Sequence, residues 1–273
     1  MGKVWFVTGS SRGLGLALVE SILASGDSVV ATARKAETLK HLVDKYSSDR
    51  VLAVPLDVTK NDQVLEAVAA AIKAFGRIDV VVNNAGYADC ASVEDMSLES
   101  FRAQMETDFF GVVHVSKAVL PVMRQQGSGH IIQISSIGGR VATPGFSAYQ
   151  SAKWAIGGFS TSLSQEVAPF GIKVTILEPG GMETDWAGSS LGMGPISEPY
   201  KQTVGAFLEL IPQSKPTWSS AAGVASIVLK VAEVDDPPLR LLAGRDTVEY
   251  AKACAEVLAA SDEKWRDLTM SSN

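Results

Sequence analysis

Cysteine and histidine are scarce in this sequence. Among 273 residues there are only two cysteines, Cys90 and Cys254, and three histidines, His41, His114 and His130, all far from one another. Two distant cysteines supply neither a disulfide framework nor a metal-ligand spacing. We therefore expect no structural metal, and a reducing compartment.

Blocks of basic residues and long apolar runs are also missing. The chain carries 24 Lys and Arg against 30 Asp and Glu, a net charge of -6, which argues against nucleic acid as a partner. No uncharged run approaches the roughly 20 residues that cross a bilayer. The first apolar run stops at Thr8-Gly9, too soon for a signal peptide. We expect a cytoplasmic protein without a membrane partner, which leaves small molecules as candidate ligands.

What the sequence does contain is a regular alternation of short β-branched runs with longer helical patterns. The runs with strand character are residues 4–8, 28–33, 51–57, 78–86, 130–135, 171–180 and 238–244. Such alternation predicts an α/β fold: a doubly wound, Rossmann-like parallel sheet with helices on both faces. Gly26, Gly76 and Gly171 each precede a strand, where a left-handed residue closes the helix before it. No linker or change of composition is visible, so we expect one domain over residues 1–273.

A glycine-rich turn, TGSSRGLG, lies between the first predicted strand and the first predicted helix. Glycines at this place let the backbone approach a pyrophosphate, and the helix amino terminus supplies free N–H groups and partial positive charge. Alone, such a turn could be an ordinary tight turn. Its position directly after the opening strand favours a dinucleotide site.

The end of the second predicted strand bears on the choice of cofactor. An acidic residue there would bind the free 2′-hydroxyl of NAD, but SVVATARK has no carboxylate and offers Arg34 with Lys35 beside it. Arg12 lies within the glycine turn. Two guanidinium groups suit a 2′-phosphate, so we predict NADP(H), although both arginines could also be solvated loop charges.

Tyr149 and Lys153 are four residues apart in a helical pattern, so their side chains should share one face of a helix. A nearby ammonium favours phenolate and should lower the tyrosine pKa toward the working range of an acid–base catalyst. Ser135 ends the run HIIQIS, at a carboxyl strand end where open α/β sheets hold ligands. Taken alone, the Tyr–Lys pair could equally be a surface pair.

These features occur in one order: TGSSRGLG, then NNAG at Asn83 to Gly86, then Ser135, Tyr149 with Lys153, and a Pro-Gly pair. In this arrangement the sequence resembles the single-domain branch of the short-chain dehydrogenase/reductase family, from residue 4 to about residue 184. The cofactor contacts that we expect, with Arg34 taken from the argument above, are Gly9, Ser11, Arg12, Leu14, Gly15, Arg34, Asp57, Val58, Asn83, Asn84, Ala85, Gly86, Tyr149, Lys153, Pro179, Gly180 and Thr184.

The resemblance also implies roles. Tyr149 would be the acid–base, Ser135 would orient the substrate carbonyl, and Lys153 would hold the nicotinamide ribose while lowering the tyrosine pKa. Asp57 and Val58 would contact the adenine, and Thr184 would contact the nicotinamide carboxamide.

One position departs from the family pattern. Relatives usually have Asn in the long helix before the fifth strand, where it anchors a water leading to the lysine, and here ETDFFGVV places Asp108 there. An ionised Asp keeps acceptors but loses the amide donors. We count Asp108 among the catalytic residues and predict a slowed but not abolished reaction. A tolerated natural exchange, a weakened enzyme and a deliberate substitution all remain open.

Residues 185–215 combine Gly, Ser and Pro with apolar side chains such as Trp186, Met193 and Phe207, and we expect them to form a lid over the nicotinamide end. The lid glycines that would permit hinge motion are Gly188, Gly192 and Gly194. The apolar side chains favour a hydrophobic ketone or secondary alcohol, although half of them could be core packing.

Small residues on the predicted Tyr149 helix, Ala155, Gly157 and Gly158, could allow close contact between subunits in a homodimer or homotetramer, or could pack inside one subunit. The leading function is an NADP(H)-dependent oxidoreductase acting on a carbonyl or alcohol substrate. A cofactor-binding sensor or scaffold with weak or no catalysis is the alternative. Epimerisation or dehydration on the same fold is a third possibility.

Overall fold

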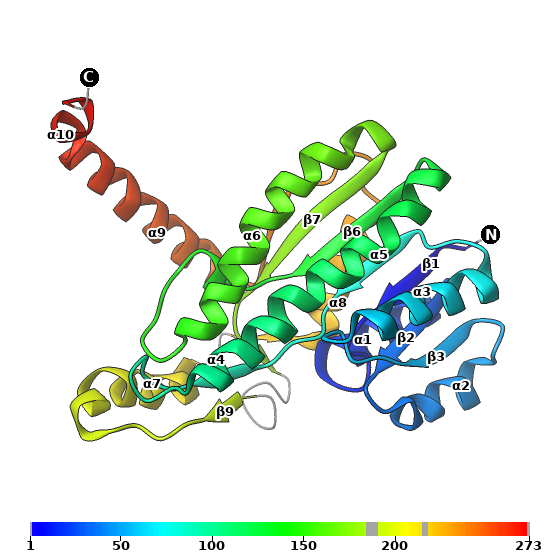
Figure 1. The fold of residues 1–273 in the computed structure, drawn as a ribbon, viewed down its shortest axis with the longest axis horizontal. Coiled ribbons are helices and arrows are strands. Elements are labelled where there is room, and N and C mark those ends of the chain that lie inside the picture. Colours follow the sequence, from blue (N-terminus) through cyan, green and yellow to red (C-terminus); the bar gives the residue numbers. More distant parts are fainter. Residues whose placement is uncertain (1, 184–190, 215–217, 272–273) are drawn as a thin grey trace.

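A parallel sheet of seven strands forms the centre of the computed structural model, which describes residues 2–183, 191–214 and 218–271 (Figure 1). Across the sheet, the strands are β11 (Arg240–Ala243), β7 (Ile172–Pro179), β6 (Gly129–Ile134), β4 (Val80–Asn83), β1 (Val4–Val7), β2 (Ser28–Ala33) and β3 (Val51–Pro55). Every neighbouring pair is parallel. The predicted doubly wound α/β fold is confirmed.

Helices cover both faces of this sheet. The α-helices of the described residues are α1 (Gly13–Ala24), α2 (Lys40–Tyr46), α3 (Asn61–Phe75), α4 (Leu98–Met105), α5 (Gly111–Gln126), α6 (Ser147–Val167), α7 (Ala206–Ser214), α8 (Ala221–Val231), α9 (Arg245–Lys264) and α10 (Arg266–Met270), and six of them pack on the sheet. One core lies between the sheet and helices α1, α2 and α8, and the other between the sheet and helices α3, α5 and α6. Side chains alternate along each strand, so Trp5 and Val7 enter the first core while Phe6 enters the second.

Glycine closes the helices where the sequence predicts it. Gly26, Gly76 and Gly171 have φ angles of 98°, 75° and 68°. Only glycine adopts this region readily, so each residue lets the chain leave a helix and turn directly into the next strand.

The long predicted helix over residues 97–123 contains a local change of pitch. Helix α4 passes into a π-helical turn, Glu106–Phe110, before α5 begins. Such a turn takes one more residue than an α-helical turn and rotates the side chains that it carries. Asp108 lies inside this turn and is completely buried.

Two small sheets, absent from the sequence analysis, lie beyond the carboxyl ends of the strands. Strand β5 (Ala88–Cys90) pairs with β9 (Leu191–Met193), and β8 (Met182–Glu183) pairs with β10 (Ser219–Ser220). The first of these sheets brings a segment of the predicted lid onto the main body. Gly192 pairs with Asp89, and the Gly194 amide donates to the Cys90 carbonyl over 2.9 Å.

A buried charge cluster joins the last strands. Glu178, at the end of β7, is fully buried and accepts from Arg140 Nε (2.7 Å) and from Arg240 Nη1 (2.8 Å). A Cβ atom on Gly157 would lie 2.6 Å from Arg240 Nη2. Of the glycines proposed to face another subunit, Gly157 therefore packs inside its own subunit, whereas Gly158 is exposed.

Candidate active site

A cavity of about 910 Å³ opens at the carboxyl ends of the parallel strands. This is the edge where doubly wound sheets hold ligands, because the turns that follow neighbouring strands meet there. The predicted site residues that line it are Gly9, Ser11, Arg12, Leu14, Gly15, Arg34, Asp57, Val58, Asn84, Ala85, Gly86, Ser135, Tyr149, Lys153, Pro179 and Gly180. Thr184 lies outside the described residues, as do Trp186 and Gly188 of the predicted lid.

The glycine turn after β1 is packed too closely to accept side chains. Gly9 has a φ of 68°, and a Cβ atom there would lie 2.9 Å from the Cα of Ala85. A Cβ atom on Gly15 would lie 2.1 Å from the Gly9 carbonyl oxygen. The turn and the first turn of α1 thus press against each other, and both line the cavity.

The NNAG segment after β4 is tied to this turn by Thr8, a residue that the sequence analysis did not single out. The backbone amides of Asn84 and Ala85 donate to Thr8 Oγ1 over 2.9 and 3.0 Å, and Asn84 Nδ2 donates to the Thr8 carbonyl over 2.9 Å. Asn83 does not line the cavity, contrary to the prediction. It is the last residue of β4, and its side chain points into the core, where it donates to Gln133 Oε1 over 2.8 Å.

Positive charge gathers where the sequence analysis placed the adenosine end. Strand β2 ends at Ala33, and the next residue, Arg34, is exposed and lines the cavity together with Arg12. The carboxylate of Asp57 accepts from Thr59 N and Thr59 Oγ1 over 3.0 and 2.8 Å and so shapes the turn after β3. Two guanidinium groups therefore lie at this end of the cavity.

Lys153 is buried beside Tyr149 on α6, as the four-residue spacing predicts. Its Nζ donates to the Ile134 carbonyl over 3.1 Å and lies 5.4 Å from the centre of the Tyr149 ring. Burial nevertheless raises the pKa of Tyr149 above its usual value, against the opposing effects of Lys153 and of a hydrogen bond with Ser136. The predicted fall in the tyrosine pKa is therefore wrong in its net direction, because burial outweighs the nearby ammonium.

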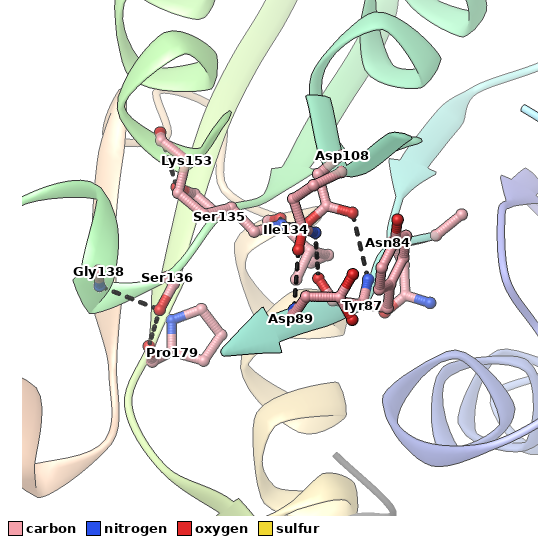
Figure 2. Close-up of polar contacts among 12 residues, drawn as sticks. Asn84, Tyr87, Asp89, Asp108, Ile134, Ser135, Ser136, Gly138, Lys153 and Pro179 are labelled. Carbon is pink, nitrogen blue, oxygen red and sulfur yellow. Dashed lines mark hydrogen bonds and ion pairs between the residues drawn. The ribbon is translucent and has the colours of Figure 1, made fainter. Parts of the chain in front are cut away.

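The two adjacent serines after β6 face different ways. The Ser135 hydroxyl is buried and donates to the Lys153 carbonyl over 3.4 Å, whereas Ser136 Oγ donates to the Pro179 carbonyl over 3.5 Å and accepts from Gly138 N over 3.0 Å (Figure 2). The Ser136 side chain also hydrogen-bonds Tyr149. Neighbouring residues of an extended chain point to opposite sides. Ser136, and not the predicted Ser135, is therefore the serine at the phenol.

Asp108 lies behind the cavity, next to the lysine. Its Oδ2 is 3.8 Å from Lys153 Nζ, and its Oδ1 accepts from the backbone N–H of Tyr87 over 3.1 Å (Figure 2). Oδ2 has no hydrogen-bond partner within the described part of the chain. Burial raises the pKa of Asp108 to about 6 despite the attraction of Lys153. A carboxyl group thus stands where the resemblance leads one to expect an amide.

The other end of the cavity, near Tyr149, is largely apolar. A separate cluster of buried and half-buried side chains packs there, drawn from β5, α6, β9 and α7 and including Phe146, Tyr149 and Phe207. Ile211 and Trp218 also line the cavity. Two further lining residues, Asp246 and Tyr250, come from the first turns of α9, which the sequence analysis did not connect with the site.

Two other findings concern the described residues. They contain no group of three or more His, Cys, Asp or Glu side chains placed to hold a metal ion. Within the same ranges, none of the helices has both the length and the apolar character that crossing a membrane requires.

Comparison with known proteins agrees with this geometry. The short chain dehydrogenase family matches residues 3–192. Oxidoreductase BOA17 of Botryotinia fuckeliana is 62% identical over 273 residues, all of both chains. The crystal structure of a short-chain dehydrogenase from Streptomyces avermitilis is 35% identical, with a TM-score of 0.93 over all of both chains. A Burkholderia cenocepacia short chain dehydrogenase in complex with NADP is 28% identical, with a TM-score of 0.76 over 96% of this chain and 97% of that one.

The raised pKa of Asp108 predicts an unusual dependence of stability on pH. The pKa of the Asp108 carboxyl is about 6 in the folded protein, against an ordinary value of 3.8 that applies to the unfolded chain. The folded protein therefore binds the carboxyl proton more tightly than the unfolded chain does. The contribution to stability is thus complete below pH 4 and is lost as the pH rises through 6. Between pH 4 and 7, we expect the unfolding free energy of Asp108→Asn to gain about 2 kcal/mol relative to that of the wild type, measured by urea titration. Asp62→Asn, at an exposed site on α3, serves as the control. If the unfolding free energies of the wild type and of Asp108→Asn change in parallel with pH, the pKa of Asp108 is not raised.

Proposed function

Because the chain belongs to the short-chain dehydrogenase family, we propose that it is an NADP(H)-dependent oxidoreductase acting on a ketone or the corresponding secondary alcohol. The observation that carries the proposal is the meeting of Tyr149, Ser136 and Lys153 in the same cavity as the glycine turn. A bound cofactor would supply or accept a hydride at its nicotinamide ring, and the side chains of the chain would manage the proton.

In the direction of reduction, the carbonyl carbon gains the hydride and the Tyr149 hydroxyl gives its proton to the carbonyl oxygen. The Ser136 hydroxyl, beside the phenol, would donate to the same oxygen as negative charge develops on it. The buried ammonium of Lys153 favours the phenolate that remains. The raised pKa of Tyr149 keeps the phenol protonated and thus ready to act as the acid, until binding changes its surroundings.

Arg34 and Arg12 support NADP(H) over NAD(H), since β2 ends without a carboxylate and both guanidinium groups border the cavity. The apolar cluster around Phe146 and Phe207 supports a hydrophobic carbonyl substrate. Strand β9 and helix α7 cover this end, in keeping with a lid within residues 185–215 of a single cofactor-binding domain. We place the protein in the cytoplasm on the sequence features alone.

A cofactor-binding sensor without catalysis fits the site less well. Binding a dinucleotide requires the glycine turn and the arginines but not a phenol hydrogen-bonded to a serine. Burying the hydroxyl of Tyr149 also costs free energy, and cofactor binding alone has no need of the phenol.

Replacing the phenol tests the function directly. We expect the wild type to oxidise NADPH with members of a panel of apolar ketones, and Tyr149→Phe to lose about 10²–10⁴-fold in kcat because the proton donor is gone. NADPH binding, followed by its fluorescence, should be retained in the variant. Tight NADPH binding by the wild type without turnover of any ketone would instead favour the sensor.

The adjacent serines provide a matched pair of variants. Ser136→Ala should lower kcat about 10²–10³-fold, the usual loss when one donor to a developing oxyanion is removed. Ser135→Ala removes a hydroxyl one residue away that bonds only the Lys153 carbonyl in the described structure, and should change kcat far less. Equal losses, or a larger loss in Ser135→Ala, would return the role to Ser135.

Cofactor choice is tested at Arg34. Arg34→Asp should raise the KM for NADPH at least tenfold and leave the KM for NADH nearly unchanged, because a carboxylate repels the 2′-phosphate and accepts from a free 2′-hydroxyl. Lys35→Asp makes the same charge change at the next residue, which does not line the cavity, and is the control. An equal rise for both cofactors in Arg34→Asp would show that Arg34 does not meet the phosphate.

A further inference from the structure

Asp89, the middle residue of strand β5, is a carboxylate at the reactive end of the cavity that the proton transfer described above does not use. Its side chain is half-buried and lines the cavity. Figure 2 shows it with Tyr87 and Asp108. Its negative charge is close enough to raise the pKa of Asp108, whose Oδ2 is 3.8 Å from Lys153 Nζ. Asp89 therefore lies near the residues that would move the proton.

A buried glutamine holds the backbone around Asp89 in place. Gln104 of α4 is fully buried, and its Oε1 accepts from the Asp89 backbone N–H over 2.9 Å. The Nε2 of the same side chain donates to the Tyr87 carbonyl over 2.7 Å. Strand β5 also pairs with β9, where Asp89 is opposite Gly192. The position of the carboxylate is thus set by a short strand with fixed partners and not by a free loop.

Gly192 leaves the space that the Asp89 carboxylate occupies. A Cβ atom on Gly192 would lie 2.1 Å from Asp89 Oδ1, and Gly192 lines the cavity as well. Gly192 is not one of the glycines with a positive φ, so its backbone conformation does not require glycine. The missing side chain instead gives the carboxylate room at the edge of the cavity.

Asp89 differs from the other two carboxylates that line the described part of the cavity. Asp57 accepts from Thr59, and Asp246 Oδ2 accepts from Gly181 N over 3.0 Å. The Asp89 carboxylate accepts no hydrogen bond and forms no ion pair within the described residues. Burial raises the pKa of Asp89 above its usual value. A half-buried carboxylate without a partner costs free energy, which a donor from a bound molecule would offset.

Extending the function proposed above, on which this step rests, we propose that Asp89 selects ketones that carry a hydroxyl or ammonium group. The carboxylate would accept a hydrogen bond from that group. The apolar side chains around Tyr149 would contact the hydrocarbon part of the same molecule. In a mostly apolar pocket, one well-placed polar group fixes the orientation of the ligand. Asp89 would thus turn the ketone carbonyl toward the phenol, as a specificity-determining residue.

Calorimetry with matched ketones tests this specificity. The probes are cyclohexanones that carry a methyl, a hydroxyl or an ammonium group at the ring carbon opposite the carbonyl. Their affinity is measured for the complex of the enzyme with NADP⁺, in which a ketone cannot be reduced. We expect the wild type to bind the hydroxyl and ammonium ketones about 10–100-fold more tightly than the methyl ketone, the usual gain from a hydrogen bond to a charged group. With NADPH, kcat/KM should follow the same order.

Variants assign the preference to the carboxylate. Asp89→Ala should bind all of these ketones with nearly equal affinity, and Gly192→Ala should weaken the preference because its Cβ atom displaces the carboxylate. Asp89→Asn keeps an acceptor oxygen but no charge, so a preference that survives for the hydroxyl ketone alone would identify a hydroxyl as the natural donor. Asp62→Ala, on the exposed side of α3, should keep the wild-type preference. So should Gly158→Ala, whose added Cβ atom meets no other described part of the chain within 4 Å.

Two results would overturn the role of Asp89. One is that the wild type binds the donor-bearing ketones no more tightly than the methyl ketone, or not measurably. The other is a preference that persists in Asp89→Ala. Failure of the proposed function has a different signature: donor-bearing ketones would bind more tightly through Asp89, but none would be reduced by NADPH. Circular dichroism confirms folding, and Asp89→Asn with the ammonium ketone replaces Asp89→Ala if that variant unfolds.

Discussion

The buried ammonium of Lys153 joins the elements that make up the reactive end of the cavity. It lies on α6, donates to a carbonyl of β6, and faces Asp108 in the π-helical turn between α4 and α5. A buried cation is costly unless its hydrogen bonds and counter-charge are in place. The positions of the sheet edge, the π turn and the catalytic helix are therefore coupled, and Tyr149 takes its place from that coupling. The arginines at the far end of the cavity need no such support, since they remain exposed.

The order of strands and helices could be predicted from the sequence because it depends on local patterns: β-branched runs, amphipathic spacing, and glycines such as Gly76 and Gly171 that end helices. The direction in which a side chain points at the end of a strand could not be predicted from the sequence. Strand β6 ends at Ile134, and the alternation that governs the strand no longer fixes the residues after it. Ser135 and Ser136 therefore looked equivalent, and Asn83 looked like its neighbour Asn84. The π turn around Asp108 carries no pattern in the sequence that separates it from an ordinary helix.

The acid–base properties of the site show the same limit. The four-residue spacing alone places the Lys153 ammonium near the Tyr149 phenol, and the ammonium lowers the tyrosine pKa as expected. The net direction depends on how much of the Tyr149 side chain is removed from water, which is a property of the whole packed structure. The same holds for Asp108, where burial exceeds the attraction of a lysine 3.8 Å away. The sequence can identify the charged partners of a titratable group, whereas the burial of that group in the folded structure decides which protonation state is favoured.

The charge cluster around Glu178 bears on how the molecule opens. Strand β11 is an edge strand, and edge strands commonly fray first. Here Arg240 of β11 is one of the two partners of a fully buried carboxylate, so detaching the strand leaves Glu178 short of a partner, at a cost of about 3–5 kcal/mol. The amides of β11 should therefore exchange with solvent nearly as slowly as those of interior strands. Since β11 leads directly into α9, the start of that helix is attached to a strand that we expect to open slowly.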